Sequence, residues 1–171
     1  MRRIILLTYV LVVTCFVSNA QKLPQFSSNE TDFWYYIEFD INSSVITDIG
    51  AEQELRNRVA VEGEEGQLWK LIGNEKCCTL VSKTGRNMFF DKSSNRFYAS
   101  ADDATALKLV TTSGGKWELQ LYDVSLAPSA NPDAVAIVIY NGSGIDHYLD
   151  VWKHDFNACA LNFVLAEDMV F

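Results

Sequence analysis

Six side chains in the last quarter of the sequence combine the groups that recognise sugars. A sugar-binding site typically places an aromatic ring against the apolar side of a pyranose and uses carboxylates and amides to hydrogen-bond its hydroxyls. Both kinds of group are concentrated here, and the candidate ligand-binding residues are Tyr148, Asp150, Trp152, His154, Asp155 and Asn157. Tyr148 and Trp152 would supply ring contact, and Asp150 would accept hydrogen bonds from hydroxyls.

A thinner set of the same groups occurs earlier, in Phe89, Asp91, Asn95 and Tyr98. The alternative interpretation of both sets is structural. On that interpretation Tyr148 and Trp152 cap a layer of hairpins, and three aspartates bond backbone amides in turns: Asp48, Asp91 and Asp150.

Catalytic and metal-binding patterns are not suggested. Glu62, Glu64 and Glu65 lie in a glycine-containing run that is typical of a solvated hairpin tip. The two histidines, His147 and His154, would face opposite sides of one strand. Neither a nucleophile elbow nor a phosphate-binding glycine loop is present, and no cysteine or histidine pair has zinc-ligand spacing. We therefore expect no enzyme activity, no metal site and no cofactor.

The first 20 residues predict a cleaved signal peptide. Met1-Arg2-Arg3 is a charged start, residues 4–17 are predominantly apolar, and Ser18-Asn19-Ala20 is a small-x-small cleavage site. A lipoprotein leader cleaved before Cys15 is a less favoured alternative, because Thr14 stands where a smaller residue is wanted. The prediction is an exported protein in the periplasm, on the cell surface or outside the cell, without stable membrane insertion.

Composition narrows the partners and the redox chemistry of the exported chain. Arg2 and Arg3 fall in the leader, so 12 of the 14 basic residues would remain against 22 acidic ones, a net charge of about −10. An acidic surface of this kind argues against nucleic acid as a partner. Cys77, Cys78 and Cys159 remain, and this odd number indicates buried small side chains with at most one pair involving Cys159.

A threefold repetition predicts the fold. A short apolar run ends in Asp48, Asp91 and Asp150, and a closing run of large-polar-large residues follows each time, as Trp69-Lys70-Leu71, Leu107-Lys108-Leu109 and Leu161-Asn162-Phe163. Repetition at about 40 to 50 residues marks a repeat architecture. Three copies favour an all-β fold, the β-trefoil, in which the first and fourth strands of each repeat form a barrel and the middle two form hairpins.

Twelve short segments, four per repeat, fit this arrangement. Residues 21–32 are predicted to be a flexible lead-in and residues 33–171 the β-trefoil domain. The expected strands are 34–39, 44–49, 58–62, 67–72, 78–83, 87–91, 96–100, 106–111, 117–122, 135–140, 148–153 and 160–165. Trp34, Trp69 and Trp117 would lie on barrel strands as core anchors, and Trp152 on a hairpin strand.

The sequence also resembles known β-trefoil modules. Gln67-Leu68-Trp69 is similar to the Q-x-W motif of ricin-type lectins, and the other two repeats depart from it. Across residues 33–171 the chain resembles the N-terminal β-trefoil module of exported polysaccharide-processing proteins of Gram-negative bacteria, on the ordered segments Trp34-Tyr35-Tyr36-Ile37, Asp48-Ile49-Gly50-Ala51, Glu62-Gly63, Gln67-Leu68-Trp69-Lys70-Leu71, Phe97-Tyr98-Ala99-Ser100 and Leu161-Asn162-Phe163-Val164. The resemblance implies a module that precedes a glycosidase domain, and hence a chain that is either a stand-alone copy or a truncated one.

Three functions are consistent with these features. The first is a noncatalytic, exported module that binds a glycan or polysaccharide and assists its degradation. The second is a structural module that packs on a glycosidase domain or a partner protein through an apolar surface. The third is a protease inhibitor that acts through the exposed loop 124–133.

Overall fold

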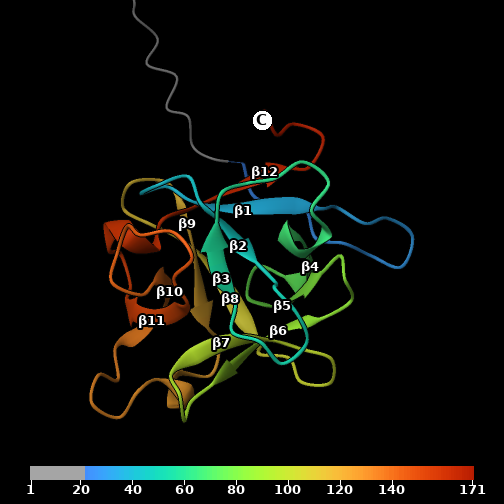
Figure 1. The fold of residues 1–171 in the computed structure, drawn as a ribbon. Helices are drawn as coiled ribbons and strands as arrows, with labels where there is room; N and C mark the ends of the chain where they lie inside the picture. Colours follow the sequence, from blue (N-terminus) through green and yellow to red (C-terminus); the bar gives the residue numbers. More distant parts are fainter. Residues whose placement is uncertain (1–21) are drawn as a thin grey trace, which may run out of the picture.

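The structure is a computed structural model that describes residues 22–171, and the predicted signal peptide lies outside the described residues. The described chain is built of strands joined by turns and three short 3-10 segments (Figure 1). The strands are β1 Tyr35–Phe39, β2 Val45–Thr47, β3 Arg56–Arg58, β4 Leu68–Asn74, β5 Cys77–Ser82, β6 Asn87–Asp91, β7 Arg96–Ser100, β8 Leu107–Thr111, β9 Trp117–Leu121, β10 Ala134–Ile139, β11 Leu149–Lys153 and β12 Leu161–Leu165. The 3-10 segments are η1 Glu65–Gln67, η2 Val124–Leu126 and η3 Asn157–Cys159.

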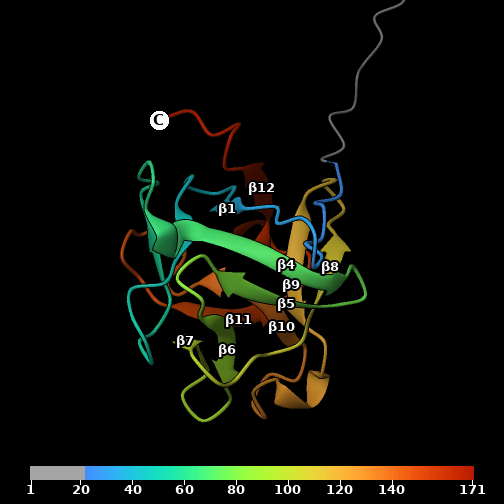
Figure 2. The same cartoon turned by 90° about the vertical axis from the view of Figure 1, so that its right-hand side faces the viewer.

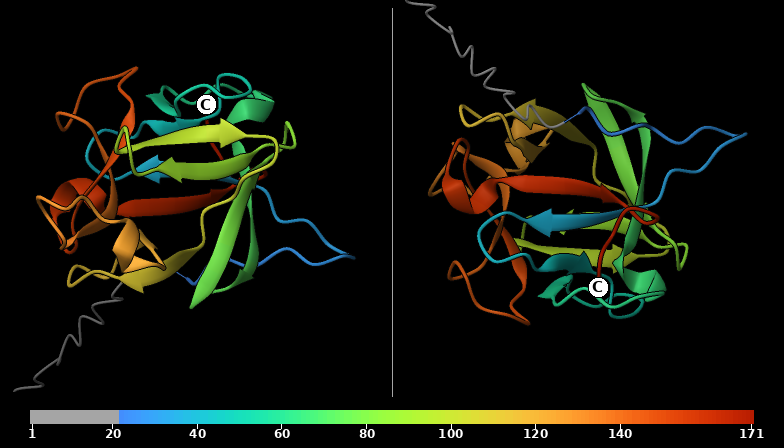
Figure 3. Two further views of the ribbon diagram at one scale, coloured as in Figure 1. Left: turned by 90° about the horizontal axis from the view of Figure 1, so that it is seen from below. Right: turned by 90° about the horizontal axis from the view of Figure 1, so that it is seen from above.

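Strand pairing confirms the β-trefoil. The first and fourth strands of the repeats pair in a closed ring, β1–β4–β5–β8–β9–β12 and back to β1. The middle strands form the hairpins β2–β3, β6–β7 and β10–β11. Figure 2 shows the long β4–β5 pair of this ring, and in Figure 3 the pair β1–β12, which joins the first repeat to the last, lies side by side.

The three closing runs occupy equivalent places, as the repetition predicted. They form the fourth strands β4, β8 and β12, and Trp69, Leu107 and Leu161 are each fully buried. Alternation along each strand sends these side chains into one shared core, where close packing of large side chains supplies most of the favourable free energy of folding. The closing runs, which repeat most closely in the sequence, are therefore the part of the pattern that predicts the fold class correctly.

The aspartate-terminated runs are not equivalent in the structure, although the repetition suggested that they are; the expected strands 87–91 and 148–153 already separated the last two. Asp48 follows β2 and Asp91 ends β6, which are second strands, whereas Asp150 lies in β11, a third strand. The second strand of the last repeat is β10, whose six residues are all buried and none of them polar. An alternating run closed by a carboxylate suits either strand of a hairpin, so the pattern could not tell one from the other.

The third strand of the first repeat was also placed too late. The prediction was 58–62, but β3 is Arg56–Arg58. Val59 and Val61 are 65% and 52% exposed, whereas the side chain of Asn57 is fully buried. The apolar valines suggested a buried strand, and the polar side chain that β3 buries hid its true position.

In the Gln67-Leu68-Trp69 segment, the Gln67 and Trp69 side chains hydrogen-bond backbone groups of other segments. Gln67 Oε1 accepts from the Val61 N–H (2.7 Å), and its Nε2 donates to the Val59 carbonyl (2.9 Å). Trp69 Nε1 donates to the Ile46 carbonyl (2.9 Å), which ties β4 to β2. Trp69 is therefore a core anchor, as expected.

The other tryptophans are less buried than Trp69. Trp117 begins β9 and Trp34 directly precedes β1, and both are partly buried. The Lys70 ammonium lies 5.1 Å from the centre of the Trp34 ring. Trp152 lies on β11, a hairpin strand as predicted, and is 47% exposed.

The segment expected to be a flexible lead-in is attached to the barrel. Ser27 forms a parallel bridge with Ile72, and its N–H donates to the Leu71 carbonyl (2.8 Å). Phe26 packs against the core, and the Gln25 N–H donates to the Tyr35 hydroxyl (2.8 Å). Apolar contact and backbone pairing thus begin before residue 33, at positions that carry little strand signal of their own.

The three described cysteines are free thiols and differ in exposure. Cys77 is exposed, whereas burial raises the pKa of Cys78 and of Cys159 to about 12. Because the thiolate is the reactive form, we expect a thiol reagent at pH 8 to label purified residues 21–171 at Cys77 alone when folded, and at Cys77, Cys78 and Cys159 after denaturation. Mass spectrometry of the labelled peptides checks this. Rapid labelling of Cys78 or Cys159 in the folded protein would contradict their burial.

Candidate functional site

The outer face of the β10–β11 hairpin carries the central residues of the candidate site. Residues alternate between two faces along a strand, so Ile137, Ile139, Leu149 and Val151 point into the core and their neighbours point outward. Val138 pairs with Asp150, and Ala136 with Trp152. The hairpin therefore holds a carboxylate and an indole side by side on a rigid strand.

A cleft of about 280 Å³ lies over this face. Its lining combines Val138 and Ala158, the turn residues Asn141 and Gly142, the carboxylate of Asp150, and three aromatic rings, Tyr140, Trp152 and Phe156. The three aromatic residues are 39%, 47% and 52% exposed respectively. Large exposed rings around one carboxylate and one amide can contact the apolar side of a polyol and hydrogen-bond its hydroxyls.

Asp150 is held in place by groups from two repeats. Its Oδ1 accepts from the Val151 N–H (2.7 Å) and from the amide of Asn95, which lies in the β6–β7 turn. Burial raises the pKa of Asp150 above its ordinary value, against the lowering effects of these hydrogen bonds and of Arg96. Both bonds go to one oxygen, and among the described residues no lysine or arginine lines the cleft. A neutral ligand that donates hydrogen bonds suits this carboxylate.

Tyr148 has neither ring face open. The Arg96 guanidinium lies 3.8 Å from its ring centre, and the Tyr140 ring stacks on it at 4.2 Å between centres. Arg96 is itself paired with Glu54. Tyr148 therefore cannot supply the ring contact expected of it from the sequence; it supports Tyr140, whose ring lines the cleft.

The other three predicted residues lie beyond the cleft. Asp155 and Asn157 line a second hollow of about 220 Å³, and His154, in the turn after β11, lines neither space. Asp155 Oδ1 accepts from the Ser113 N–H (2.9 Å) and hydroxyl (2.8 Å), and these bonds lower its pKa. Of the six predicted side chains, the structure therefore brings Asp150 and Trp152 together in the cleft.

The lining residues with aromatic or amide side chains that the sequence analysis missed are Tyr140, Asn141 and Phe156. Tyr140 and Asn141 open the glycine-containing turn after β10, and Phe156 stands between two residues that were named. The missing information was spatial. Phe156 reaches the cleft because η3 folds back over β10, where Ala136, Val138, Ala158 and Cys159 form a small apolar cluster.

The turn before Phe156 is fixed by a buried carboxylate. Glu118 on β9 accepts the Asp155 N–H through Oε1 (2.5 Å) and the Gln120 amide through Oε2 (2.8 Å). Asp155 adopts a left-handed φ of 56°, which reverses the chain. With the backbone of Asp155 held by Glu118 and its side chain by Ser113, Phe156 is positioned before any ligand arrives.

Each of the three repeated aspartates accepts a hydrogen bond from a nearby backbone N–H: Asp48 from Gly50 (3.0 Å), Asp91 from Ser93 (2.9 Å) and Asp150 from Val151 (2.7 Å). Asp48 accepts from Arg86 Nε (2.8 Å), Ser82 Oγ (2.8 Å) and Thr84 Oγ1 (2.6 Å). Asp91 Oδ1 accepts hydrogen bonds from the N–H (2.9 Å) and the hydroxyl (2.8 Å) of Ser93 in the turn that follows, and these bonds lower the pKa of Asp91. The hydrogen bonds that the structural interpretation expects are therefore present at all three aspartates. Asn95, one of the earlier set of candidate residues, donates its amide to Asp150.

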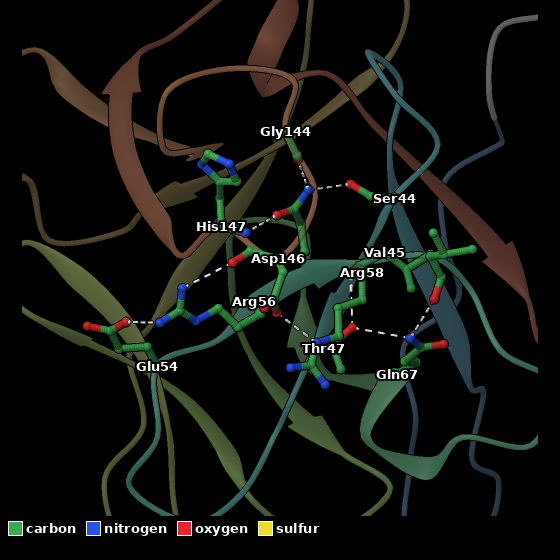
Figure 4. A network of polar contacts seen from close by, with 12 residues as sticks. Ser44, Val45, Thr47, Glu54, Arg56, Arg58, Gln67, Gly144, Asp146 and His147 are labelled. Carbon is green, nitrogen blue, oxygen red and sulfur yellow. Dashed lines mark hydrogen bonds and ion pairs between the residues drawn. The ribbon is translucent and has the colours of Figure 1, made fainter.

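Asn57 locks the loop that leads into β11 by hydrogen bonds to Ser44, Gly144 and His147, the partners that Figure 4 labels. Its Oδ1 accepts the His147 N–H (2.8 Å), and its Nδ2 donates to the Gly144 carbonyl (2.6 Å) and to Ser44 Oγ (2.9 Å). Its backbone exchanges hydrogen bonds with His147 and Asp146. A fully buried amide of repeat one therefore sets the register of the hairpin in repeat three.

Replacing Asn57 with leucine should destabilise the protein by about 2 to 4 kcal/mol, because the Gly144 carbonyl and the His147 N–H would lose their buried partner. Urea unfolding of N57L measures this. Asn29, which is exposed in the segment before β1, provides the matched control, and N29L should change stability by less than about 0.5 kcal/mol. Equal stability of the two variants would show that the Asn57 network contributes little.

The structure also bears on metals, membranes and the loop 124–133. Among the described residues, no group of three His, Cys, Asp or Glu side chains could hold a metal ion, and no helix is long and apolar enough to cross a membrane. The loop 124–133 begins with η2, capped by Asp123, and buries Ala127. Its first part is therefore a packed turn rather than an extended segment.

Solved structures with the same fold include lectins and parts of larger proteins. The Macrolepiota procera ricin B-like lectin, solved in complex with lactose, has a TM-score of 0.64 and 13% identity, covering 82% of this chain and 98% of that one. A GlcNAcα1-4Gal-releasing endo-β-galactosidase from Clostridium perfringens has a TM-score of 0.61 and 9% identity, and a mosquitocidal holotoxin 0.63 and 9%. The match covers 78% of this chain in both cases, but 32% of the enzyme and 17% of the toxin.

These neighbours define the class of fold. The chain is a β-trefoil whose structural neighbours include ricin B-like lectins. No protein-family model matches the sequence, and a search of characterised proteins finds no match.

Proposed function

We propose that this protein is an exported, noncatalytic carbohydrate-binding module whose site is the cleft on the β10–β11 hairpin. The observation that carries the proposal is the grouping of three exposed aromatic rings, Tyr140, Trp152 and Phe156, around the carboxylate of Asp150. The lectin neighbours support the class of ligand. The endo-β-galactosidase neighbour, of which a module like this forms part, supports a role as an accessory to polysaccharide degradation.

The charge of the site selects among glycans. The chain has a net charge of −8, and the cleft is lined by the carboxylate of Asp150. Uronic acids and sulfated sugars would meet repulsion there, whereas neutral sugars offer the hydroxyl donors that a carboxylate accepts. The proposed ligands are neutral glycans in the periplasm, at the cell surface or outside the cell.

The test is direct binding by purified residues 21–171. The probes are glucose, galactose, mannose and lactose, together with homo-oligosaccharides of the three hexoses with two to four units, measured by titration calorimetry. Saturable binding of at least one probe, lost when Trp152 or Asp150 is changed, is expected. Folded protein that binds none of them, or that binds without involving these side chains, would remove the cleft from consideration.

An apolar surface favours a second candidate, a structural module that packs on a glycosidase domain or another partner. Val59, Val61, Val170 and Phe171 are exposed by 52% to 90%. Tyr36 links them, since its ring meets Phe171 edge to face and its hydroxyl donates to the Val61 carbonyl (3.2 Å). This candidate predicts folded protein without glycan affinity.

A further inference from the structure

Phe156 separates two hollows and lines both. On one side is the cleft of Trp152 and Asp150, and on the other is the second hollow, whose walls are the β8–β9 turn and the segment Asp155–Asn157. Phe156 is 52% exposed and stands at the start of η3, with its backbone turn fixed from Glu118 and Ser113. A ligand that covered this ring would enter both hollows.

The second hollow is polar where the first is aromatic. Thr112, Ser113 and Asn157 give it hydroxyl and amide groups. At its edge, Lys116 Nζ lies 3.0 Å from Asp40 Oδ1 and donates to Asn162 Oδ1 (3.0 Å), and the Lys116 bond lowers the pKa of Asp40. Its acidic and basic charges are therefore partly balanced, and its groups can both donate to and accept from sugar hydroxyls.

The volumes indicate that one hollow is small for a complete ligand. Small-molecule sites commonly occupy about 300 to 1,000 Å³. The cleft, at about 280 Å³, and the second hollow, at about 220 Å³, each fall below this range, and together they fall within it.

We propose that the natural ligand is a neutral oligosaccharide of at least two units that lies across Phe156, with one unit against Trp152 and Asp150 and the next in the second hollow. The inference rests on the proposed function and goes beyond it, because it specifies the length of the ligand and adds a subsite. Phe156 would then contact both units, while the hydroxyls of the second unit would meet Thr112, Asn157 and Lys116.

Gly114 offers a way to close the second hollow without disturbing the first. It lines the second hollow, lies outside the left-handed region, and an added Cβ would meet only Thr112 Oγ1, at an ordinary 3.7 Å. G114L should therefore fill the hollow, whereas G114A is the matched control that adds one methyl group.

The experiment compares the affinities of one-unit and longer probes in the hexose series that binds. For the wild type and G114A, we expect at least about a tenfold rise in affinity from one unit to two or more, which is about 1.4 kcal/mol. G114L should lose this rise while its affinity for the single sugar stays within about twofold of the wild type.

The outcomes separate this inference from the proposed function. If no probe binds, the proposed function fails and the subsite falls with it. If a series binds but length brings no gain, or if G114L keeps the gain, the subsite is wrong while the cleft stands. The comparison of probe lengths needs no variant, so a missing gain in the wild type would overturn the subsite even if G114L does not fold.

Discussion

Replacement of Trp152 with alanine should lower the affinity for a bound glycan at least about 30-fold, or about 2 kcal/mol, as expected for a central aromatic contact. Trp152 stands on a rigid strand, and nearly half of its surface is exposed in the cleft. Little conformational entropy is lost when a sugar covers such a ring, so most of the contact energy is retained in the affinity.

The same change should leave the domain folded. Trp152 is on the outer face of the hairpin, whereas the core contacts of strand β11 come from Leu149 and Val151. We expect a stability loss of about 1 kcal/mol in urea unfolding. Tyr122 provides a matched control, because it is 54% exposed and its side chain lies outside the cleft lining, so Y122A should bind as the wild type does.

Two results would contradict this assignment. Unchanged affinity of W152A would mean that the sugar lies elsewhere, and an unfolded W152A would mean that the indole is a cap of the hairpin layer. W152F adds a graded test, since a smaller ring in the same place should recover part of the lost affinity.

The barrel could be predicted from the sequence because its signals are local. Trp69, Leu107 and Leu161 each lie in a short run with alternating polarity, and alternation places such side chains on one face of a strand whatever the rest of the chain does. The three runs also repeat, which predicted a barrel of the first and fourth strands; β1 and β12 are among the strands that pair in it.

The site could be predicted from the sequence only where its residues are neighbours on one face of a single strand. Asp150 and Trp152 share a face of β11, which a period of two makes visible in the sequence. Tyr148 shares that face as well, but Arg96 from repeat two covers its ring, and no local pattern reports a contact over such a separation. Phe156 needed the fold of η3 over β10, which depends on a small apolar cluster rather than on any motif.

The polar anchors of the hairpin show the same limit. Asn57 is a polar residue among charged neighbours in the sequence, yet it is fully buried and fixes the loop before β11. Asn57 acts at the contact between repeats one and three. Because a buried, fully hydrogen-bonded amide is still a polar residue in the sequence, the pattern of apolar residues does not reveal it. Residues of this kind explain why the position of β3 was misjudged.

Replacement of Asp150 with asparagine is expected to weaken glycan binding about 10- to 100-fold, because hydrogen bonds from sugar hydroxyls to a carboxylate are stronger than those to an amide. The fold should tolerate the change. In D150N the side-chain amide oxygen could accept from the Val151 N–H and the Asn95 amide, as Oδ1 of Asp150 does. Burial raises the pKa of Asp150, which shows that its charge carries a desolvation cost. Removing the charge removes this cost and also removes the attraction to Arg96, and the two effects on stability oppose each other.

The raised pKa of Asp150 gives this prediction a dependence on pH. Protonation removes the acceptor charge, so affinity should fall on acidification through the pKa of Asp150, at a higher pH than an ordinary aspartate would require. The effect on folding has the opposite sign, because the folded state takes up this proton more readily than the unfolded one, so protonation at Asp150 favours the fold. We expect the glycan affinity of the folded wild type to fall on acidification. The remaining affinity of D150N should not show this fall. Identical pH profiles for the two proteins would show that the carboxylate does not bind the sugar.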